Sequence, residues 1–160
     1  YSQSMGLETV GLRYFNVFGP RQDPTSQYSA VIPLFITAVI EGRRPTIYGD
    51  GTQTRDFTYV ANNVQANILA ATTPNNVAGK IINIACGTSF SVLDLLKAVN
   101  DALGKNIDPI FAPARKGDVK HSLADISLAR ELLGYKIEVD FTEGIKRTVE
   151  WYLKHNADCP

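Results

Sequence analysis

The stretch IINIACGTSFSVLDLLKAVNDALG, residues 81–104, combines a short strand with an amphipathic helix. Ile81 to Ala85 form a mostly apolar run of the length that is typical of a strand buried in a parallel sheet. Ser91 and Asp94 then have the spacing of a capping box, and Gly104 follows the last apolar residue as a helix C-cap does. A buried strand that leads into a helix predicts an α/β fold.

The same alternation extends in both directions along the chain. Runs rich in β-forming residues predict strands, the first of them buried, and apolar residues at three- and four-residue spacing predict helices. The predicted strands are Glu8–Phe18, Thr46–Tyr48, Thr54–Val60 and Pro109–Ala112. The predicted helices are Tyr28–Glu41, Asn63–Ala71, Asp125–Leu133 and a last helix that begins at Thr142.

Composition narrows the class of protein. The 160 residues are 44% hydrophobic and 20% charged, as in one globular domain. Sixteen basic residues balance sixteen acidic ones, which argues against nucleic acid as a partner because phosphate-binding surfaces carry a basic excess. No apolar run approaches the roughly 20 residues that span a bilayer. With only Cys86 and Cys159, we expect no disulfide framework, no metal site and a cytoplasmic location.

Arginines near turns and in loops are the candidates for ligand binding, because the sequence has no glycine-rich phosphate loop, paired metal ligands or nucleophile elbow. The three candidates are Arg13, Arg55 and Arg115. A planar guanidinium pairs with two phosphate oxygens at once, so separated arginines can converge on a diphosphate. Each arginine taken alone is better explained by a structural ion pair.

Five blocks of sequence carry a resemblance to a known family. They are RYFNVFGPRQDP (13–24), AVIP (30–33), IYGDGTQTRDFTYV (47–60), INIACG (82–87) and RKGDVKHSLAD (115–125). In this order and spacing they resemble the NAD-dependent epimerase/dehydratase family of extended short-chain dehydrogenases. The resemblance is closest to 4-epimerases that act on UDP-glucose and UDP-N-acetylglucosamine.

The resemblance implies the C-terminal portion of a Rossmann-like doubly wound protein together with its smaller α/β substrate-binding domain. Residues 7–19, 53–72 and 81–87 would end the cofactor-domain sheet. Residues 20–52 and 88–160 would form the substrate-binding domain, so that the two parts interleave within one compact fragment. The chain begins at Tyr1 without an initiator Met, and we expect the N-terminal NAD-binding half to be absent.

The family also implies roles for residues at the end of the first strand and in the first helix. Tyr14 and Phe15 would border the nicotinamide of NAD, and Asn16 would hydrogen-bond the sugar or its diphosphate. The backbone around Val31 and Ile32 would contact the nucleotide.

Four further residues complete the implied substrate site. Tyr48 would lie beside the uracil, Arg55 and Arg115 would clamp the diphosphate, and Asp118 would lie near the ribose. Two guanidiniums offset the two charges of a diphosphate and leave the hexose free to turn.

Ser122 is the residue that would bear on substrate choice. The family can carry a bulky tyrosine at this position, so a serine would leave room for an N-acetyl group. Alternatively, Ser122 only satisfies the hydrogen bonds of its own loop.

In the family, a Tyr-x-x-x-Lys pair moves the hydroxyl proton while NAD takes and returns a hydride at C4. The sequence contains no such pair, so we expect the intact parent to be the enzyme, a homodimer with no membrane contact, and this chain alone to be inactive. Two alternatives remain open. The parent is a 4,6-dehydratase or a decarboxylase of the same family, since fold does not decide the reaction, or the chain is a non-catalytic nucleotide-sugar-binding module.

Overall fold

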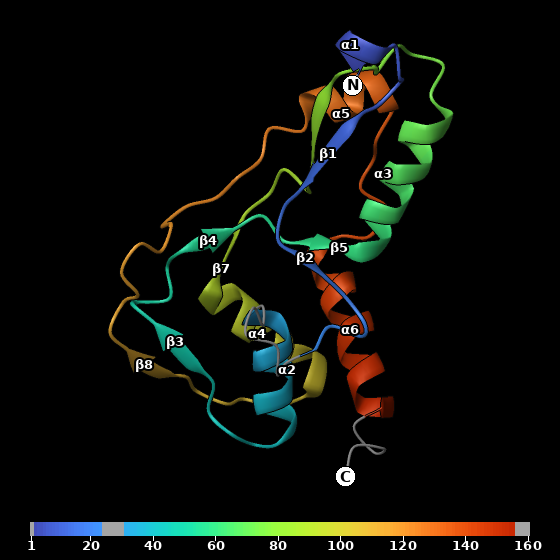
Figure 1. The fold of residues 1–160 in the computed structure, drawn as a ribbon. Coiled ribbons are helices and arrows are strands. Elements are labelled where there is room, and N and C mark those ends of the chain that lie inside the picture. Colours follow the sequence, from blue (N-terminus) through green and yellow to red (C-terminus); the bar gives the residue numbers. More distant parts are fainter. Residues whose placement is uncertain (1, 24–30, 156–160) are drawn as a thin grey trace.

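The computed structural model of the chain describes residues 2–23 and 31–155, and Figure 1 gives their arrangement. The helices are α1 Ser2–Met5, α2 Val31–Ile40, α3 Val60–Thr72, α4 Val92–Leu103, α5 Ser127–Leu133 and α6 Phe141–His155. The strands are β1 Gly11–Tyr14, β2 Val17–Phe18, β3 Thr46–Tyr48, β4 Thr54–Arg55, β5 Thr58–Tyr59, β6 Ile81–Ile84, β7 Phe90–Ser91 and β8 Ile110–Ala112. No helix in these two ranges is both long and apolar enough to cross a bilayer.

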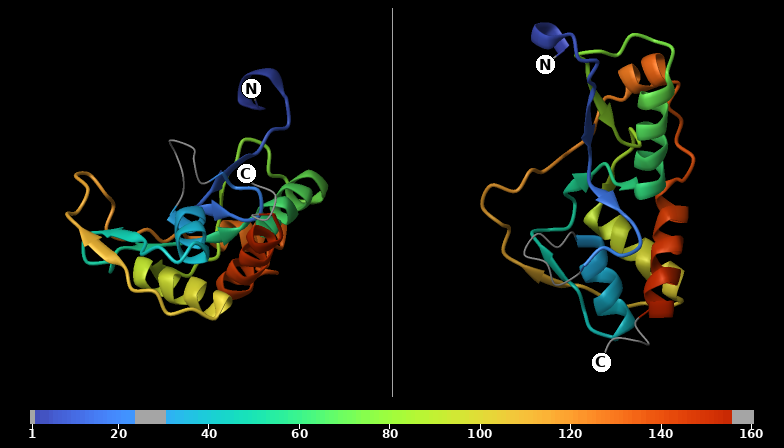
Figure 2. Two further views of the ribbon diagram at one scale, coloured as in Figure 1. Left: turned by 90° about the horizontal axis from the view of Figure 1, so that it is seen from below. Right: turned by 45° about the vertical axis from the view of Figure 1, so that its right-hand side comes forward.

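The strands form four short pairs, and three of the four are parallel. β1 pairs with β6, β2 with β5 and β3 with β8 in parallel, whereas β4 and β7 are antiparallel. Parallel pairs need long crossover connections, and here helices such as α2 and α3 lie within them. The predicted α/β class is therefore confirmed. Figures 1 and 2 show the 113–126 loop, which runs from β8 at one end of the molecule to α5 at the other.

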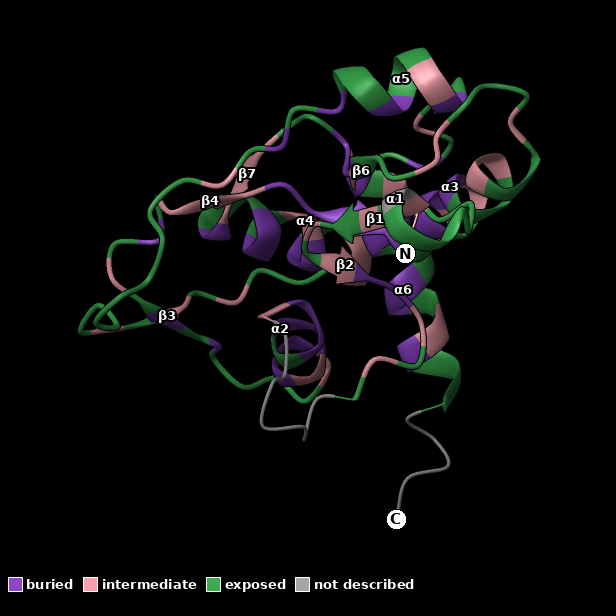
Figure 3. Ribbon diagram, turned by 45° about the horizontal axis from the view of Figure 1, so that its top comes forward, coloured by how far each residue is buried: buried purple, intermediate pink, exposed green. Residues whose placement is uncertain are grey.

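Two clusters of buried side chains hold these elements together. The larger cluster joins α2, α4 and α6, and in it Phe18 meets Phe57 and Phe141 edge to face. The smaller cluster lies around β6, α3 and α5, where Ile82 and Ile84 are fully buried. Figure 3 shows the buried residues concentrated on the facing sides of these helices. The candidate functional site lies beside the larger cluster, with which it shares Phe35 and Ile47.

The predicted strand Glu8–Phe18 is interrupted, and its prediction as a buried strand was wrong for β1. Asn16 has a φ of 37°, in the left-handed region, and this separates β1 from β2. Gly11, Arg13 and Tyr14 are exposed, because among the described residues β1 pairs only with β6. The predicted strand Thr54–Val60 also splits, into β4 and β5, with Asp56 and Phe57 between them.

Several helix ends follow the sequence signals, but α3 begins at Val60 rather than at Asn63, α5 begins at Ser127 rather than at Asp125, and α2 ends at Ile40 rather than at Glu41. The capping box of Ser91 and Asp94 forms at α4, and Gly104 ends that helix in the left-handed conformation. The last helix begins at Phe141 rather than at Thr142, because the Asp140 carboxylate accepts the Glu143 N–H at 2.9 Å. The predicted start of the first long helix, residues 28–30, lies outside the described residues.

Candidate functional site

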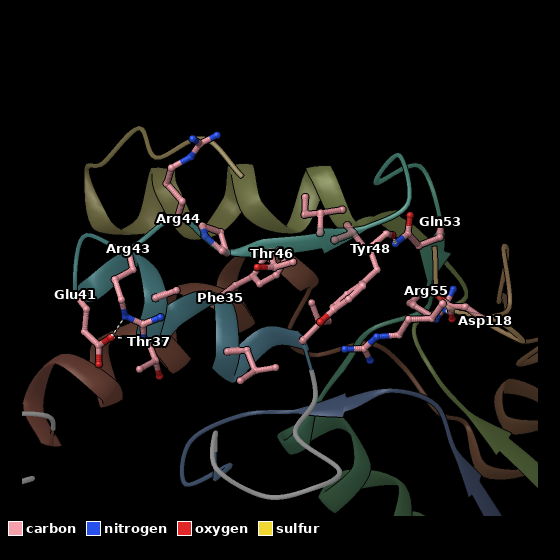
Figure 4. A pocket seen from close by; sticks show the side chains of 17 residues that line it. Phe35, Thr37, Glu41, Arg43, Arg44, Thr46, Tyr48, Gln53, Arg55 and Asp118 are labelled. Carbon is pink, nitrogen blue, oxygen red and sulfur yellow. Dashed lines mark hydrogen bonds and ion pairs between the residues drawn. The ribbon is translucent and has the colours of Figure 1, made fainter. Parts of the chain in front are cut away.

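A pocket of about 830 Å³ opens between α2, β3, β4 and the 113–126 loop. This volume lies within the range of small-molecule sites. Its lining residues include Val31, Phe35, Tyr48, Arg55, Arg115 and Asp118. Figure 4 shows Tyr48 between two ends of the pocket, with Arg55 and Asp118 at one end and Glu41 and Arg43 at the other. Residues predicted to hold a nucleotide therefore come together from elements far apart in the sequence.

Arg55 reaches across from β4 to the 113–126 loop. One terminal nitrogen lies 2.5 Å from Asp118 Oδ1, and the other donates to the carbonyl oxygen of Thr54 at 2.8 Å. The Arg55 side chain is 19% exposed and that of Asp118 is 39% exposed. The guanidinium is thus largely desolvated at the pocket wall, with its orientation fixed by two acceptors.

Arg115 packs on the aromatic ring of Tyr48. Its guanidinium carbon lies 3.9 Å from the ring centroid, which is a cation–π contact. Tyr48 is held from behind, because its carbonyl oxygen accepts a hydrogen bond from Gln53 Nε2 at 2.8 Å. The second predicted arginine therefore reaches the same pocket from the 113–126 loop, packed on a residue of β3.

The pocket is positively charged. Its described lining residues include four arginines but only two carboxylates, namely Arg43, Arg44, Arg55 and Arg115 against Glu41 and Asp118. Glu41 pairs with Arg43 at the far end. The end that holds Arg55, Arg115 and Asp118 keeps one uncompensated cation, which favours an anionic ligand there.

Thr54 in β4 anchors the loop that carries Arg115 and Asp118. Its N–H donates to the Lys120 carbonyl at 2.9 Å, and its own carbonyl accepts the Ser122 N–H at 3.1 Å. Thr54 Oγ1 also lies 3.1 Å from His121 Nδ1. These contacts fix the 113–126 loop relative to Arg55, although the loop has no regular secondary structure beyond one bridge to Thr54.

The remaining predicted substrate residues lie apart from the pocket lining. Ser122 is half-buried beside β4, and Asn16 is exposed at the strand break, where Nδ2 donates to the Asp56 carbonyl at 3.0 Å. Ile32 is 1% exposed and belongs to the larger buried cluster, whereas its neighbour Val31 lines the pocket.

Tyr14 and Phe15, predicted to border the cofactor, do not line this pocket. Tyr14 is the last residue of β1, and Phe15 follows it. Tyr14 is exposed, and its hydroxyl is 3.0 Å from Asn67 Oδ1 in a second depression of about 730 Å³. Phe15 packs against the smaller buried cluster, and its N–H donates to the Ile84 carbonyl at 3.2 Å.

Several residues in or near the pocket were not predicted from the sequence to belong to a site. Phe35 and Ala38 line the pocket from α2, where the apolar spacing marked them only as core residues. Asp56, beside Arg55, is fully buried behind the pocket and is not one of its lining residues. Cys86 is buried, and desolvation raises the pKa of its thiol to about 11, so that the unreactive thiol form is favoured at neutral pH.

Comparisons with known proteins agree on one family. The profile of the NAD dependent epimerase/dehydratase family matches residues 1–85. A UDP-glucose 4-epimerase from Mycolicibacterium smegmatis is 38% identical over 152 residues, which are 95% of this chain and 48% of that protein. A dTDP-glucose 4,6-dehydratase from an Actinoplanes species is 37% identical over 159 residues, covering 98% of this chain and 48% of the relative.

A solved structure is similar over nearly the whole chain. It is a UDP-N-acetylglucosamine 4-epimerase from Methanobrevibacter ruminantium in complex with UDP-N-acetylmuramic acid. The TM-score is 0.89 at 46% identity, over 96% of this chain and 49% of that one. This chain therefore spans about half the length of the relatives that it matches. By its sequence profile and its fold, the chain belongs to the NAD-dependent epimerase/dehydratase family.

Proposed function

We propose that this chain forms the nucleotide-sugar-binding half of an NAD-dependent 4-epimerase that acts on UDP-hexoses or UDP-N-acetylhexosamines. The observation that carries the proposal is the meeting of Arg55, Arg115, Tyr48 and Asp118 in one positively charged pocket. Each of the four is a residue for which the family resemblance implies a part in holding UDP.

In the proposed complex, the diphosphate takes the place that Asp118 now has beside Arg55. Two oxygens of one phosphate can accept hydrogen bonds from the Arg55 guanidinium, and Arg115 supplies the second positive charge. Asp118, released from Arg55, becomes free to accept a hydrogen bond from a ribose hydroxyl. Tyr48 offers an aromatic face for the uracil. The nucleotide would be held through its uracil, its ribose and its diphosphate, and the hexose would stay free to turn.

Binding and orientation are the contributions that we propose for this chain. NAD, when bound, supplies the acceptor and donor of the C4 hydride. Exposed Tyr14 and its neighbour Phe15 are suited to border the nicotinamide, and Asn16 is suited to hydrogen-bond the sugar. The sequence contains neither a glycine-rich pyrophosphate turn nor a Tyr-x-x-x-Lys pair. Its residues therefore fit only the nicotinamide end of a cofactor site.

The division into two parts and the homodimeric state of the intact enzyme are also proposals. The β1–β6 pair supports a cofactor-domain edge made of residues 7–19, 53–72 and 81–87. The β3–β8 pair and the helices α2 and α4 support a substrate-binding domain made of residues 20–52 and 88–160.

A second candidate reaction is 4,6-dehydration, favoured by the similarity to the Actinoplanes dehydratase. The pocket serves either reaction equally, because it contacts the nucleotide and not the reacting carbons. Product analysis of a longer protein that includes this chain separates the two reactions. An epimerase yields a product of unchanged mass, and a dehydratase yields a product lighter by one water.

Calorimetric titration of the chain with UDP and with uridine tests the proposed site. We expect UDP to bind at least about tenfold more tightly than uridine, because each charge-assisted hydrogen bond to the diphosphate contributes about 1.5–3 kcal/mol. Equal affinities, or no binding of UDP, would refute the diphosphate clamp.

A further inference from the structure

Asp56, between β4 and β5, is a fully buried carboxylate that pairs with no basic side chain among the described residues. Its partners are main-chain N–H groups. Oδ1 accepts from Cys86 at 2.9 Å, and Oδ2 accepts from Gly87 at 2.9 Å and from Ala124 at 3.3 Å. One side chain thus connects the end of β6 to the end of the 113–126 loop.

The main chain of Asp56 makes a third connection. Its carbonyl oxygen accepts from Asn16 Nδ2 at 3.0 Å, and the Asn16 carbonyl accepts the Thr58 N–H at 3.2 Å. Asn16 has a φ of 37°, which is uncommon for a residue other than glycine. The break between β1 and β2 is therefore held against the break between β4 and β5 by these two bonds.

The three segments that meet at Asp56 carry most of the proposed substrate residues. Arg55 directly precedes it, Asn16 bonds to its carbonyl, and Ala124 ends the loop that bears Arg115 and Asp118. Thr54 anchors the middle of that loop, so Asp56 fixes its far end.

Burying a carboxylate without a cation is costly. Desolvation raises the pKa of Asp56 above its ordinary value, although three N–H donors act in the opposite direction. An apolar side chain at this place would leave the N–H groups of Cys86, Gly87 and Ala124 without this acceptor, and those of Cys86 and Ala124 are buried. The carboxylate is thus suited to setting a backbone geometry rather than to adding net stability.

We propose that Asp56 is a positioning residue for nucleotide-sugar binding, which holds Arg55, Asn16 and the loop of Arg115 and Asp118 in their relative places. The inference rests on the proposed function, because its effect is read through the affinity for UDP. It concerns a residue that would not touch the ligand.

The test compares Asp56→Asn with a matched control, Asn62→Ala. Asn62 is also fully buried and also bonds to three main-chain groups, namely the N–H groups of Glu138 and Val139 and the carbonyl of Val139. Neither Glu138 nor Val139 is a proposed substrate residue. UDP affinity is measured by calorimetry on the 160-residue chain, and folding by circular dichroism and thermal melting.

We expect both variants to melt earlier than the unaltered chain, but only Asp56→Asn to weaken UDP binding, by about tenfold or more. In a double-mutant cycle with Arg55→Ala, the two losses should be less than additive, because Asp56 acts in part through Arg55. UDP binding by folded Asp56→Asn within twofold of the unaltered chain, or additive losses, would overturn the inference. Failure of the unaltered chain to bind UDP would instead overturn the proposed function, and this inference with it.

A second measurement covers the case in which Asp56→Asn does not fold. Amide hydrogen exchange of the unaltered chain is followed with and without UDP. If Asp56 links the pocket to its surroundings, UDP should slow exchange at Gly87 and Ala124 more than at Val139, which lies at the control junction. Equal changes at the three amides would contradict the proposal.

Discussion

Replacing Arg55 with alanine is the most direct test of the pocket. The change removes a side chain that is 19% exposed and leaves Asp118, its present partner, able to turn to solvent because that carboxylate is 39% exposed. No buried charge is left unpaired, so the variant should remain folded. A loss of affinity for UDP can then be assigned to the lost guanidinium.

The expected magnitude is the difference of two terms. Charge-assisted hydrogen bonds from Arg55 to a phosphate contribute about 1.5–3 kcal/mol. Binding must first break the partly exposed Arg55–Asp118 pair, which offsets up to about 1 kcal/mol. The net loss on substitution therefore lies between about 0.5 and 3 kcal/mol, or roughly 2- to 160-fold in Kd.

Calorimetry with UDP at low and moderate salt measures this loss. Arg147→Ala is the matched control, because Arg147 also pairs with a carboxylate, Glu143, but on the exposed face of α6. The control should bind UDP as the unaltered chain does. If Arg55→Ala also binds UDP within twofold, the diphosphate is not held at Arg55 and the argument from the pocket fails.

Three further predictions concern specificity and stability. Ser122→Tyr should weaken binding of UDP-N-acetylglucosamine much more than of UDP-glucose, and equal losses in paired titrations would refute the N-acetyl role. Ser91→Ala should lower the free energy of unfolding by about 1 kcal/mol in urea titrations. The pKa of Asp94 is lowered, mainly by its side-chain bond with Ser91. The part of the stabilisation that depends on the carboxylate is present above the ordinary carboxyl pKa and lost as pH falls through the lowered one. The difference between variant and unaltered chain should therefore shrink in acid, to what the Asp94 N–H bond to the Ser91 hydroxyl contributes. Gly144→Ala should destabilise by about 1–3 kcal/mol, because the added Cβ would lie 2.8 Å from Phe18 Cζ, and an unchanged urea midpoint would show that α6 can shift away.

Local signals in the sequence were enough for the types of the longer elements, whereas the short elements α1 and β7 were not predicted. The capping box at Ser91 and the glycine after α4 act within one helical turn, so their effect can be read from neighbouring residues. The breaks at Asn16 and Asp56 could not be predicted in this way. They depend on hydrogen bonds between segments far apart in the sequence, such as that from Asn16 to the Asp56 carbonyl.

The pocket was predictable only as a set of residues, and its geometry was not. The family resemblance named Tyr48, Arg55, Arg115 and Asp118 together, and the structure brings them to one pocket. The same reasoning gave no reason to expect Arg115 on the ring of Tyr48, because a cation–π contact has no fixed spacing in sequence. Asp56 has no such signal, because nothing in the sequence distinguishes a buried carboxylate from a solvated one.

The parallel pairing of distant strands has a consequence for how the chain acquires its structure. Arg13 lies opposite Asn83, 70 residues later, and Thr46 lies opposite Ile110. Loops of this length must close before either pair forms, so folding should be slow compared with that of a helical protein of the same size. During synthesis, β3 must wait for β8 to leave the ribosome. The pocket lined by Tyr48 should therefore form only after β8 has been synthesised, and a chain cut short before residue 110 has β3 but not the strand that pairs with it.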